Sequence, residues 1–107
     1  MENGTVTTLE GAAGSVDHLV SASPCALLGL WYHTPGTDIS VFPYVITLFD
    51  EAATADIDAN SKILYRTTIS DPAANPNLSF SIQSGKGLCV RFAADGTNTS
   101  LLGINWR

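Results

Sequence analysis

The chain has 107 residues, of which 45% are hydrophobic and 14% are charged, and its formal net charge at pH 7 is −5. This length favours one domain with its own core. The five Lys and Arg residues are scattered, so the basic patch that binds nucleic acid is missing, and an anionic bilayer would repel the chain. The low charge implies a surface of Ser, Thr, Asn and Gly, which suits sheets, turns and burial against a partner.

Residues 1–15 are rich in Gly, Ala and Thr, and they predict a flexible N-terminal arm with at most a short strand around residues 6–9. This segment has neither the basic start nor the apolar centre of a signal peptide, and no run of the chain is long enough to span a membrane. We therefore expect synthesis in the cytoplasm, with residues 16–107 forming a single β-sandwich domain.

Seven segments of this domain predict short strands, because each is rich in β-branched, aromatic or aliphatic residues and is bounded by turn residues. They are residues 16–22, 25–34, 44–49, 62–69, 78–83, 88–92 and 101–106. The Ala-rich residues 50–60 predict a long loop, with one helical turn as the alternative. Turn signals recur roughly every 8–12 residues, which is typical of an all-β antiparallel β-sandwich or jelly-roll-like fold.

The clearest alternation lies in residues 78–92. Leu78, Phe80 and Ile82 alternate with polar residues and are predicted to face the core. Residues 84–87 contain two glycines and predict a tight turn, so that the strands on either side of it would form a hairpin.

The two cysteines, Cys25 and Cys89, lie far apart in apolar runs. A disulfide would require two facing strands, whereas a reducing compartment favours two buried free thiols, which is the interpretation we prefer.

Few side chains suit catalysis. His18 and His33 are the only histidines, and neither accompanies a G-x-S-x-G nucleophile motif or an acidic partner at a recognised spacing. Two cysteines and two histidines also lack the short paired spacing of a zinc site. The Gly-Lys-Gly of residues 85–87 lacks the remainder of a phosphate-binding motif. We therefore expect no enzyme activity, no metal and no cofactor, with both histidines at surface or turn positions.

Asp56, Asp58 and Asn60 form a D-x-D-x-N pattern, which opens the calcium loop of an EF-hand. The sixth and twelfth positions are Ser61 and Thr67, where that loop needs Gly and Glu, and no flanking helices are predicted. The favoured interpretation is a solvated acidic loop whose Asp residues cap turns, with weak calcium binding as the alternative.

Aromatic residues offer two further hypotheses. Trp31, Tyr32, Tyr44 and Trp106 would form a sugar-stacking platform if they shared an exposed sheet face, although aromatic residues in strands are more often core. Trp106 and Arg107 are the more informative pair, because a Trp beside a chain end is hard to bury fully and a partner chain can cover it.

Several runs together resemble a known family. They are residues 44–50 (YVITLFD), the Ala/Thr loop after them, residues 62–65 (KILY), and residues 87–92 (GLCVRF) between a Ser-Phe-Ser-Ile strand and an apolar last strand. Over about residues 25–106 the pattern resembles the small β-sandwich virion proteins of tailed bacteriophages, of the capsid decoration or cement type.

The resemblance implies a multi-copy structural protein, often trimeric, that binds the major capsid protein on the outside of the assembled head and stabilises it. The predicted location is then the virion surface, with Trp31, Asp50, Trp106 and Arg107 as candidate interface residues. The N-terminal arm has no counterpart in this pattern. The alternative is a tail-fibre-like or other β-sandwich module that binds a glycan or another ligand.

Overall fold

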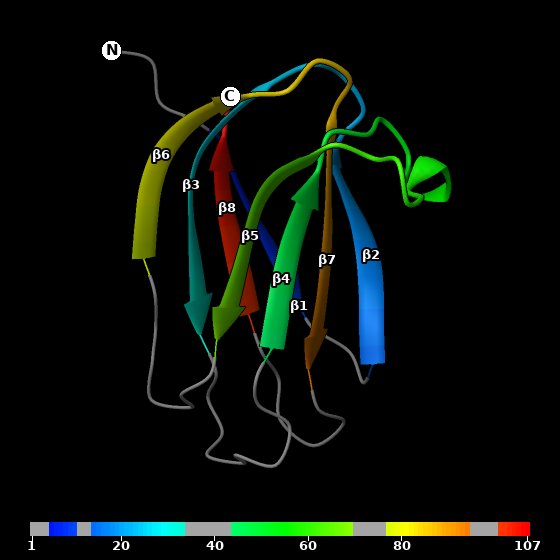
Figure 1. Ribbon diagram of the computed structural model, residues 1–107. Helices are drawn as coiled ribbons and strands as arrows, with labels where there is room; N and C mark the ends of the chain where they lie inside the picture. Colours follow the sequence, from blue (N-terminus) through cyan, green and yellow to red (C-terminus); the bar gives the residue numbers. More distant parts are fainter. Residues whose placement is uncertain (1–4, 11–13, 34–43, 70–76, 95–100) are drawn as a thin grey trace.

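The computed structural model describes residues 5–10, 14–33, 44–69, 77–94 and 101–107 (Figure 1). The described strands are β1 (Thr5–Glu10), β2 (Gly14–Ser21), β3 (Ala26–His33), β4 (Tyr44–Phe49), β5 (Ile63–Ile69), β6 (Asn77–Gln83), β7 (Leu88–Ala94) and β8 (Leu101–Trp106). One 3₁₀ turn, η2 (Thr54–Asp56), lies in the loop after β4. The seven predicted strands are therefore confirmed, with shifts of at most two residues at their ends.

The strands form two four-stranded antiparallel sheets, so the predicted β-sandwich is confirmed. Sheet A has the order β1-β8-β3-β6 and sheet B the order β2-β7-β4-β5. Among the described strands, only β4 and β5 are both consecutive in sequence and adjacent in a sheet. Every other connection between consecutive strands passes from one sheet to the other, which is the eight-stranded jelly-roll arrangement.

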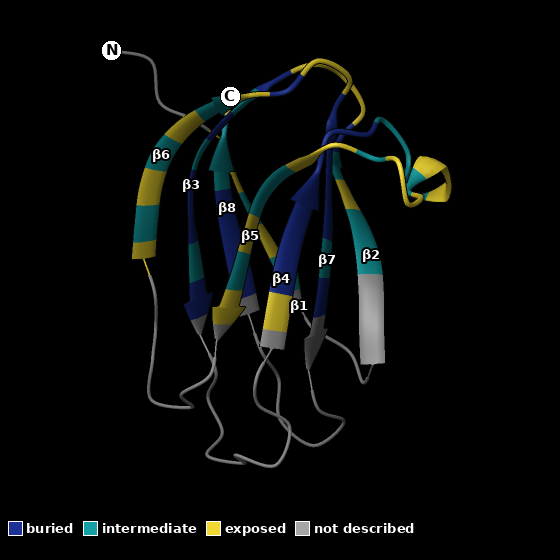
Figure 2. Cartoon of the chain, in the orientation of Figure 1, coloured by how far each residue is buried: buried dark blue, intermediate teal, exposed yellow. Residues whose placement is uncertain are grey.

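The core lies between the two sheets and is built from alternate residues of the strands. Figure 2 shows that burial is greatest along β4 and β7, the central strands of sheet B. The buried cluster consists of Cys25, Leu27, Leu30, Tyr32, Ile46, Leu48, Leu88, Val90, Phe92, Leu102 and Ile104. Leu78, Phe80 and Ile82 pack against this cluster from the edge strand β6, as their alternation predicted.

The expectation of a flexible arm over residues 1–15 needs correction. Thr5–Glu10 forms β1 and pairs with β8 along its whole length, and β2 begins at Gly14. The segment was assigned to an arm because it contains little apolar sequence. β1 is an edge strand whose other face meets solvent, so it can pack against the core with few apolar residues. Leu9 is the inward side chain that does so.

The predicted hairpin of residues 78–92 is wrong. β6 pairs with β3 in sheet A, whereas β7 pairs with β2 and β4 in sheet B, so residues 84–87 form a corner between the sheets. Alternation cannot distinguish the two arrangements, because apolar residues face the same core in both. Long-range hydrogen bonds hold the corner instead: the Ser84 N–H donates to the Cys25 carbonyl at 2.8 Å, and the Cys25 N–H donates to Ser84 Oγ at 2.9 Å.

Asp50 holds the other side of this corner. Its carboxylate accepts hydrogen bonds from the backbone N–H groups of Lys86 at 2.8 Å, Gly85 at 3.0 Å and Gly87 at 3.3 Å. Burial alone would raise the pKa of Asp50, but these three donors and the charge of Lys62 outweigh burial and hold the pKa below its usual value. Asp50 is thus an internal anion bound by successive backbone amides.

Candidate interaction surface

The outer face of sheet B carries two rows of side chains that run across its four strands. The pairing register places Leu19, Cys89, Phe49 and Ile63 side by side in an apolar row. The adjacent row consists of Asp17, Arg91, Thr47 and Arg66; it lies two residues along β2, β7 and β4, and three along β5, where the register shifts. Because neighbouring residues in register share a face, the strands themselves position these groups.

Exposed aliphatic side chains concentrate on this face. Leu19 is 48% exposed, Ile63 47% and Val45 36%, and they are three of the four large hydrophobic residues most exposed among the described residues. The fourth, Val6, is 60% exposed and lies on sheet A. Single exposed aliphatic residues are ordinary; these three share one sheet face but lie apart on it, with Leu19 and Ile63 on its opposite edge strands.

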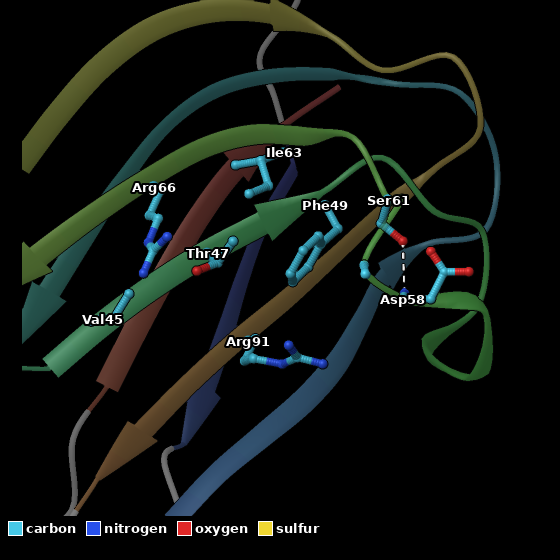
Figure 3. A pocket seen from close by; sticks show the side chains of 9 residues that line it. Val45, Thr47, Phe49, Asp58, Ser61, Ile63, Arg66 and Arg91 are labelled. Atoms are coloured by element: carbon cyan, nitrogen blue, oxygen red, sulfur yellow. Dashed lines mark hydrogen bonds between the residues drawn. The ribbon is translucent and has the colours of Figure 1, made fainter.

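A hollow of about 340 Å³ lies on the same face (Figure 3). Its lining comes from the outward residues of β4, from β5 and β7, and from the loop that follows η2. The lining residues are Val45, Thr47, Phe49, Asp58, Ala59, Ser61, Ile63, Arg66 and Arg91.

The two arginines of this face have different surroundings. Arg91 donates from Nε to Asp17 Oδ1 at 2.7 Å and from Nη2 to Asp17 Oδ2 at 3.1 Å, and its guanidinium lies 5.2 Å from the centre of the Phe49 ring. This bidentate bond lowers the pKa of Asp17 and raises the pKa of Arg91. Arg66, at the other end of the row, is exposed and forms no ion pair with any described residue. Among the described residues, Arg66 thus contributes to this face a positive charge that forms no ion pair, on a protein of net charge −5.

The polar groups of the acidic loop beside the hollow form hydrogen bonds within the loop itself. Asp58 Oδ1 accepts the Asn60 N–H at 2.8 Å, and the Asp58 N–H donates to Ser61 Oγ at 2.9 Å. Ser61 Oγ in turn donates to Glu51 Oε2 at 2.6 Å. The turn-capping interpretation of Asp58 is confirmed. The part of the chain that the structure describes contains no group of three or more His, Cys, Asp or Glu side chains suited to a metal ion.

The outer face of sheet A has a different character. The register aligns Thr8, Gly103, Trp31 and Asn77 in one row, and Val6, Asn105, Gly29 and Ser79 in the next. A smaller hollow of about 190 Å³ is lined by Val6, Leu28, Gly29, Leu30, Trp31, Asn77, Leu78, Ser79 and Asn105. None of these lining residues is ionisable.

The four residues expected at an interface occupy four separate places. Trp31 lies half-buried on the outer face of sheet A, and the exposed Arg107 continues β8 with backbone bonds to Ala26. Asp50 is only 7% exposed and binds the corner described above, so its predicted interface role is corrected to an internal one. Trp106 packs against the core and donates from Nε1 to Thr7 Oγ1 at 3.0 Å, so the chain itself provides the cover expected from a partner.

The favoured interpretation of the strand aromatic residues as core is confirmed for Tyr32 and Trp106, so the alternative of a four-residue sugar platform does not hold. Tyr32 is buried in the core at 1% exposure and Trp106 faces inward, which leaves Trp31 alone on the outer face of sheet A. The side chain of Tyr44 lies outside the described residues.

His18 is neither a surface nor a turn residue, contrary to expectation. It lies in β2 with its ring 5.2 Å from that of Phe92, and its buried Nε2 has no hydrogen-bond partner among the described residues. Burial lowers the pKa of His18, against a smaller opposite effect of Asp17. His33 ends β3, and its side chain lies outside the described residues.

Sequence reasoning missed the outer face of sheet B. Residues 44–49 are apolar at almost every position, so the outward pair Val45 and Phe49 could not be separated from the core residues between them. Arg66 and Arg91 are 25 positions apart in the chain, and only the pairing of β5 and β7 with β4 brings them to either side of Thr47.

No protein-family model matches the chain, and no curated protein is significantly similar to it. Within the described residues, no helix is both long and apolar enough to cross a membrane.

Proposed function

We propose that the protein is a non-enzymatic virion structural protein of the capsid decoration type, which docks onto the assembled major-capsid lattice through the outer face of sheet B. The observation that carries the proposal is that Leu19, Val45 and Ile63 are all exposed on this one face, which also presents Arg66, a residue with no ion pair to any described residue. Aliphatic and aromatic groups mixed with arginine are the composition of protein interfaces. The sequence resemblance and the jelly-roll topology, which is common among viral shell proteins, also support it.

The size of this face favours binding to an assembly over binding to a single subunit. Four strands about 4.8 Å apart and about seven residues long cover roughly 450 Å². A standard interface buries about 800 Å² on each partner, so one such contact is weak. A homo-oligomer, trimeric as the resemblance implies, would present several copies to the lattice at once and gain affinity through avidity.

The proposal is tested by light scattering of the purified protein, followed by sedimentation with candidate intact phage heads and, separately, with free capsid subunits. We expect an oligomer that co-sediments with heads and not with free subunits. Binding to the assembled state alone would also raise the thermal stability of the heads. A monomer that ignores every intact head would contradict the proposal.

Three variants locate the docking face. Val45→Asp and Arg66→Glu should each weaken head binding at least tenfold. Val45→Asp buries a charge in the contact, and Arg66→Glu reverses the charge of a side chain that forms no ion pair with any described residue. Val6→Asp is the matched control, since Val6 is an exposed aliphatic residue on the opposite sheet. Equal loss of binding in all three variants would exclude the outer face of sheet B as the specific contact.

The hollow on sheet A favours a second function, the recognition of a small neutral ligand. Its lining has no ionisable side chain, and it lies on the opposite sheet from the docking face. Variants can therefore separate the two functions.

A further inference from the structure

The hollow on the outer face of sheet A is built around Trp31. Leu30 and Tyr32 point into the core, so alternation directs Trp31 outward, where the register places it opposite Gly103. A side chain at position 103 would collide with the ring, because a Cβ there would lie 1.9 Å from Trp31 Cε2. Because Gly103 has no side chain, the Trp31 indole packs directly over the backbone of Gly103. The ring stays partly accessible beside the hollow.

A second glycine opens the hollow next to a polar atom. Gly29 lies directly opposite Asn105 on one side and Ser79 on the other. Asn105 Oδ1 is buried and has no hydrogen-bond partner among the described residues. Asn105 lines the hollow together with the exposed Asn77 and Ser79 of β6. A buried acceptor without a donor is uncommon in folded proteins, and a ligand hydroxyl would satisfy it once the Asn105 side chain turns towards the hollow.

We propose that this hollow binds a neutral sugar ring. A sugar presents apolar C–H groups to an aromatic ring and hydroxyl donors and acceptors to amides and hydroxyls, which is the mixture that Trp31, Asn105, Asn77 and Ser79 offer. This inference rests on the second function proposed above and not on docking to a shell.

The lining also excludes other ligand classes. A charged ligand would find no counter-charge among the described lining residues, and the net charge of −5 disfavours acidic sugars in particular. A wholly apolar ligand would bury Asn105 Oδ1 more deeply without pairing it. The volume of about 190 Å³ is below the roughly 300–1,000 Å³ of pockets for drug-sized molecules, so it suits one ring at the end of a longer glycan.

The experiment uses the single-tryptophan variant Trp106→Phe, in which Trp31 is the only indole. Its emission is followed during titration with neutral hexoses, N-acetylhexosamines, hexuronic acids and a set of neutral non-sugar fragments, with saturation-transfer NMR as a second readout. We expect a saturable change in Trp31 emission with at least one neutral sugar. The matching uronic acid should bind at least tenfold more weakly.

Two further variants keep the result interpretable. Asn105→Ala, which removes the unpaired acceptor, should weaken binding at least tenfold. Val6→Trp adds bulk at an exposed lining position without touching the core, so it should abolish binding even if Asn105→Ala is poorly folded; because it adds an indole, its binding is measured by saturation-transfer NMR alone. Val45→Asp should leave sugar binding unchanged.

Each contrary outcome has a separate meaning. Non-sugar fragments alone acting at Trp31 would overturn the sugar inference and leave the second function standing, while no saturable ligand would overturn both. If Val6→Trp abolishes head binding and no sugar binds, the hollow is a protein contact and the inference is wrong.

Discussion

At the scale of single residues, the buried Asp50 has a structural role at the corner between the sheets that its position in the sequence did not indicate. One carboxylate satisfies three backbone donors at a corner where the chain passes between sheets. Gly87 is buried, so its N–H would otherwise be left without a partner in the protein interior, which is costly. The aromatic-Asp step that contributed to the family resemblance therefore has a structural explanation that does not require a partner.

Asp50→Asn should lower the free energy of unfolding by about 1.5–3 kcal/mol, because an amide keeps the shape but loses the charge-assisted hydrogen bonds. Urea denaturation at pH 7 measures the change. Asp56→Asn is the control, since Asp56 is exposed, and its effect should stay within about 0.5 kcal/mol. Because the folded-state pKa of Asp50 is depressed, the stabilisation is present above the unfolded value of about 3.9 and is lost as pH falls below it. An unchanged difference between parent and variant at pH 2 would contradict this assignment.

His18 should make the protein less stable as the pH falls from 7 towards 5. Its pKa is lower in the folded chain than the unfolded value of about 6.5, so below that value the unfolded state binds more protons and is favoured. His18→Leu removes the titrating group and the unpaired Nε2 while keeping an apolar contact with Phe92. Denaturation midpoints measured across this pH range should fall less steeply for the variant; parallel slopes would exclude His18.

At the scale of elements, the strand limits could be predicted from sequence but the strand partners could not. Composition and turn residues located the strands from β2 to β8, since each strand depends on its own residues. Pairing depends on contacts between distant segments, so the β6–β7 connection was assigned to a hairpin although Ser84, Cys25 and Asp50 make it a corner. The sequence predicted at most a short strand around residues 6–9; the full length of β1 and its partner could not be predicted for the same reason, because pairing with β8 stabilises a segment that has few apolar residues of its own.

The corner provides a matched pair of glycine substitutions. A Cβ at Gly87 would lie 2.5 Å from the Ser21 carbonyl oxygen and 2.8 Å from that of Glu51, whereas a Cβ at Gly85 would have only Asp50 Oδ2 at 3.5 Å. Gly87→Ala should therefore destabilise by about 1–3 kcal/mol, because backbone must move, and Gly85→Ala by less than about 0.5 kcal/mol. Thermal and urea unfolding check this order; equal effects would show that the corner is not close-packed.

At the scale of the whole molecule, the two cysteines report on cooperative unfolding. Both are free and buried, as predicted, with Cys25 at the start of sheet A and Cys89 in sheet B. Burial, followed by the charges of Glu51, Asp17 and Asp56, raises the pKa of Cys89 to about 11. The thiols should thus react with a disulfide reagent such as Ellman's only when the sandwich opens.

The measurement compares the labelling rate with the unfolding rate at several urea concentrations. Both thiols should be labelled at the rate of global unfolding, and a reductant should leave the melting temperature unchanged. Fast labelling of Cys89 in the absence of denaturant would show that the loop after β4 opens on its own, since the Cys89 thiol donates to the Glu51 carbonyl of that loop.

The pairing of β1 with β8 has a consequence for how the protein is made. These two strands come from opposite ends of the described chain, and β8 also joins β1 to β3. On a ribosome, sheet A has a gap at its centre until β8 has emerged, so the apolar side chains of sheet B remain uncovered while synthesis continues. Folding of the sandwich must then wait until β8 has left the ribosome, and we expect the slow, millisecond-to-second kinetics of folds dominated by distant contacts.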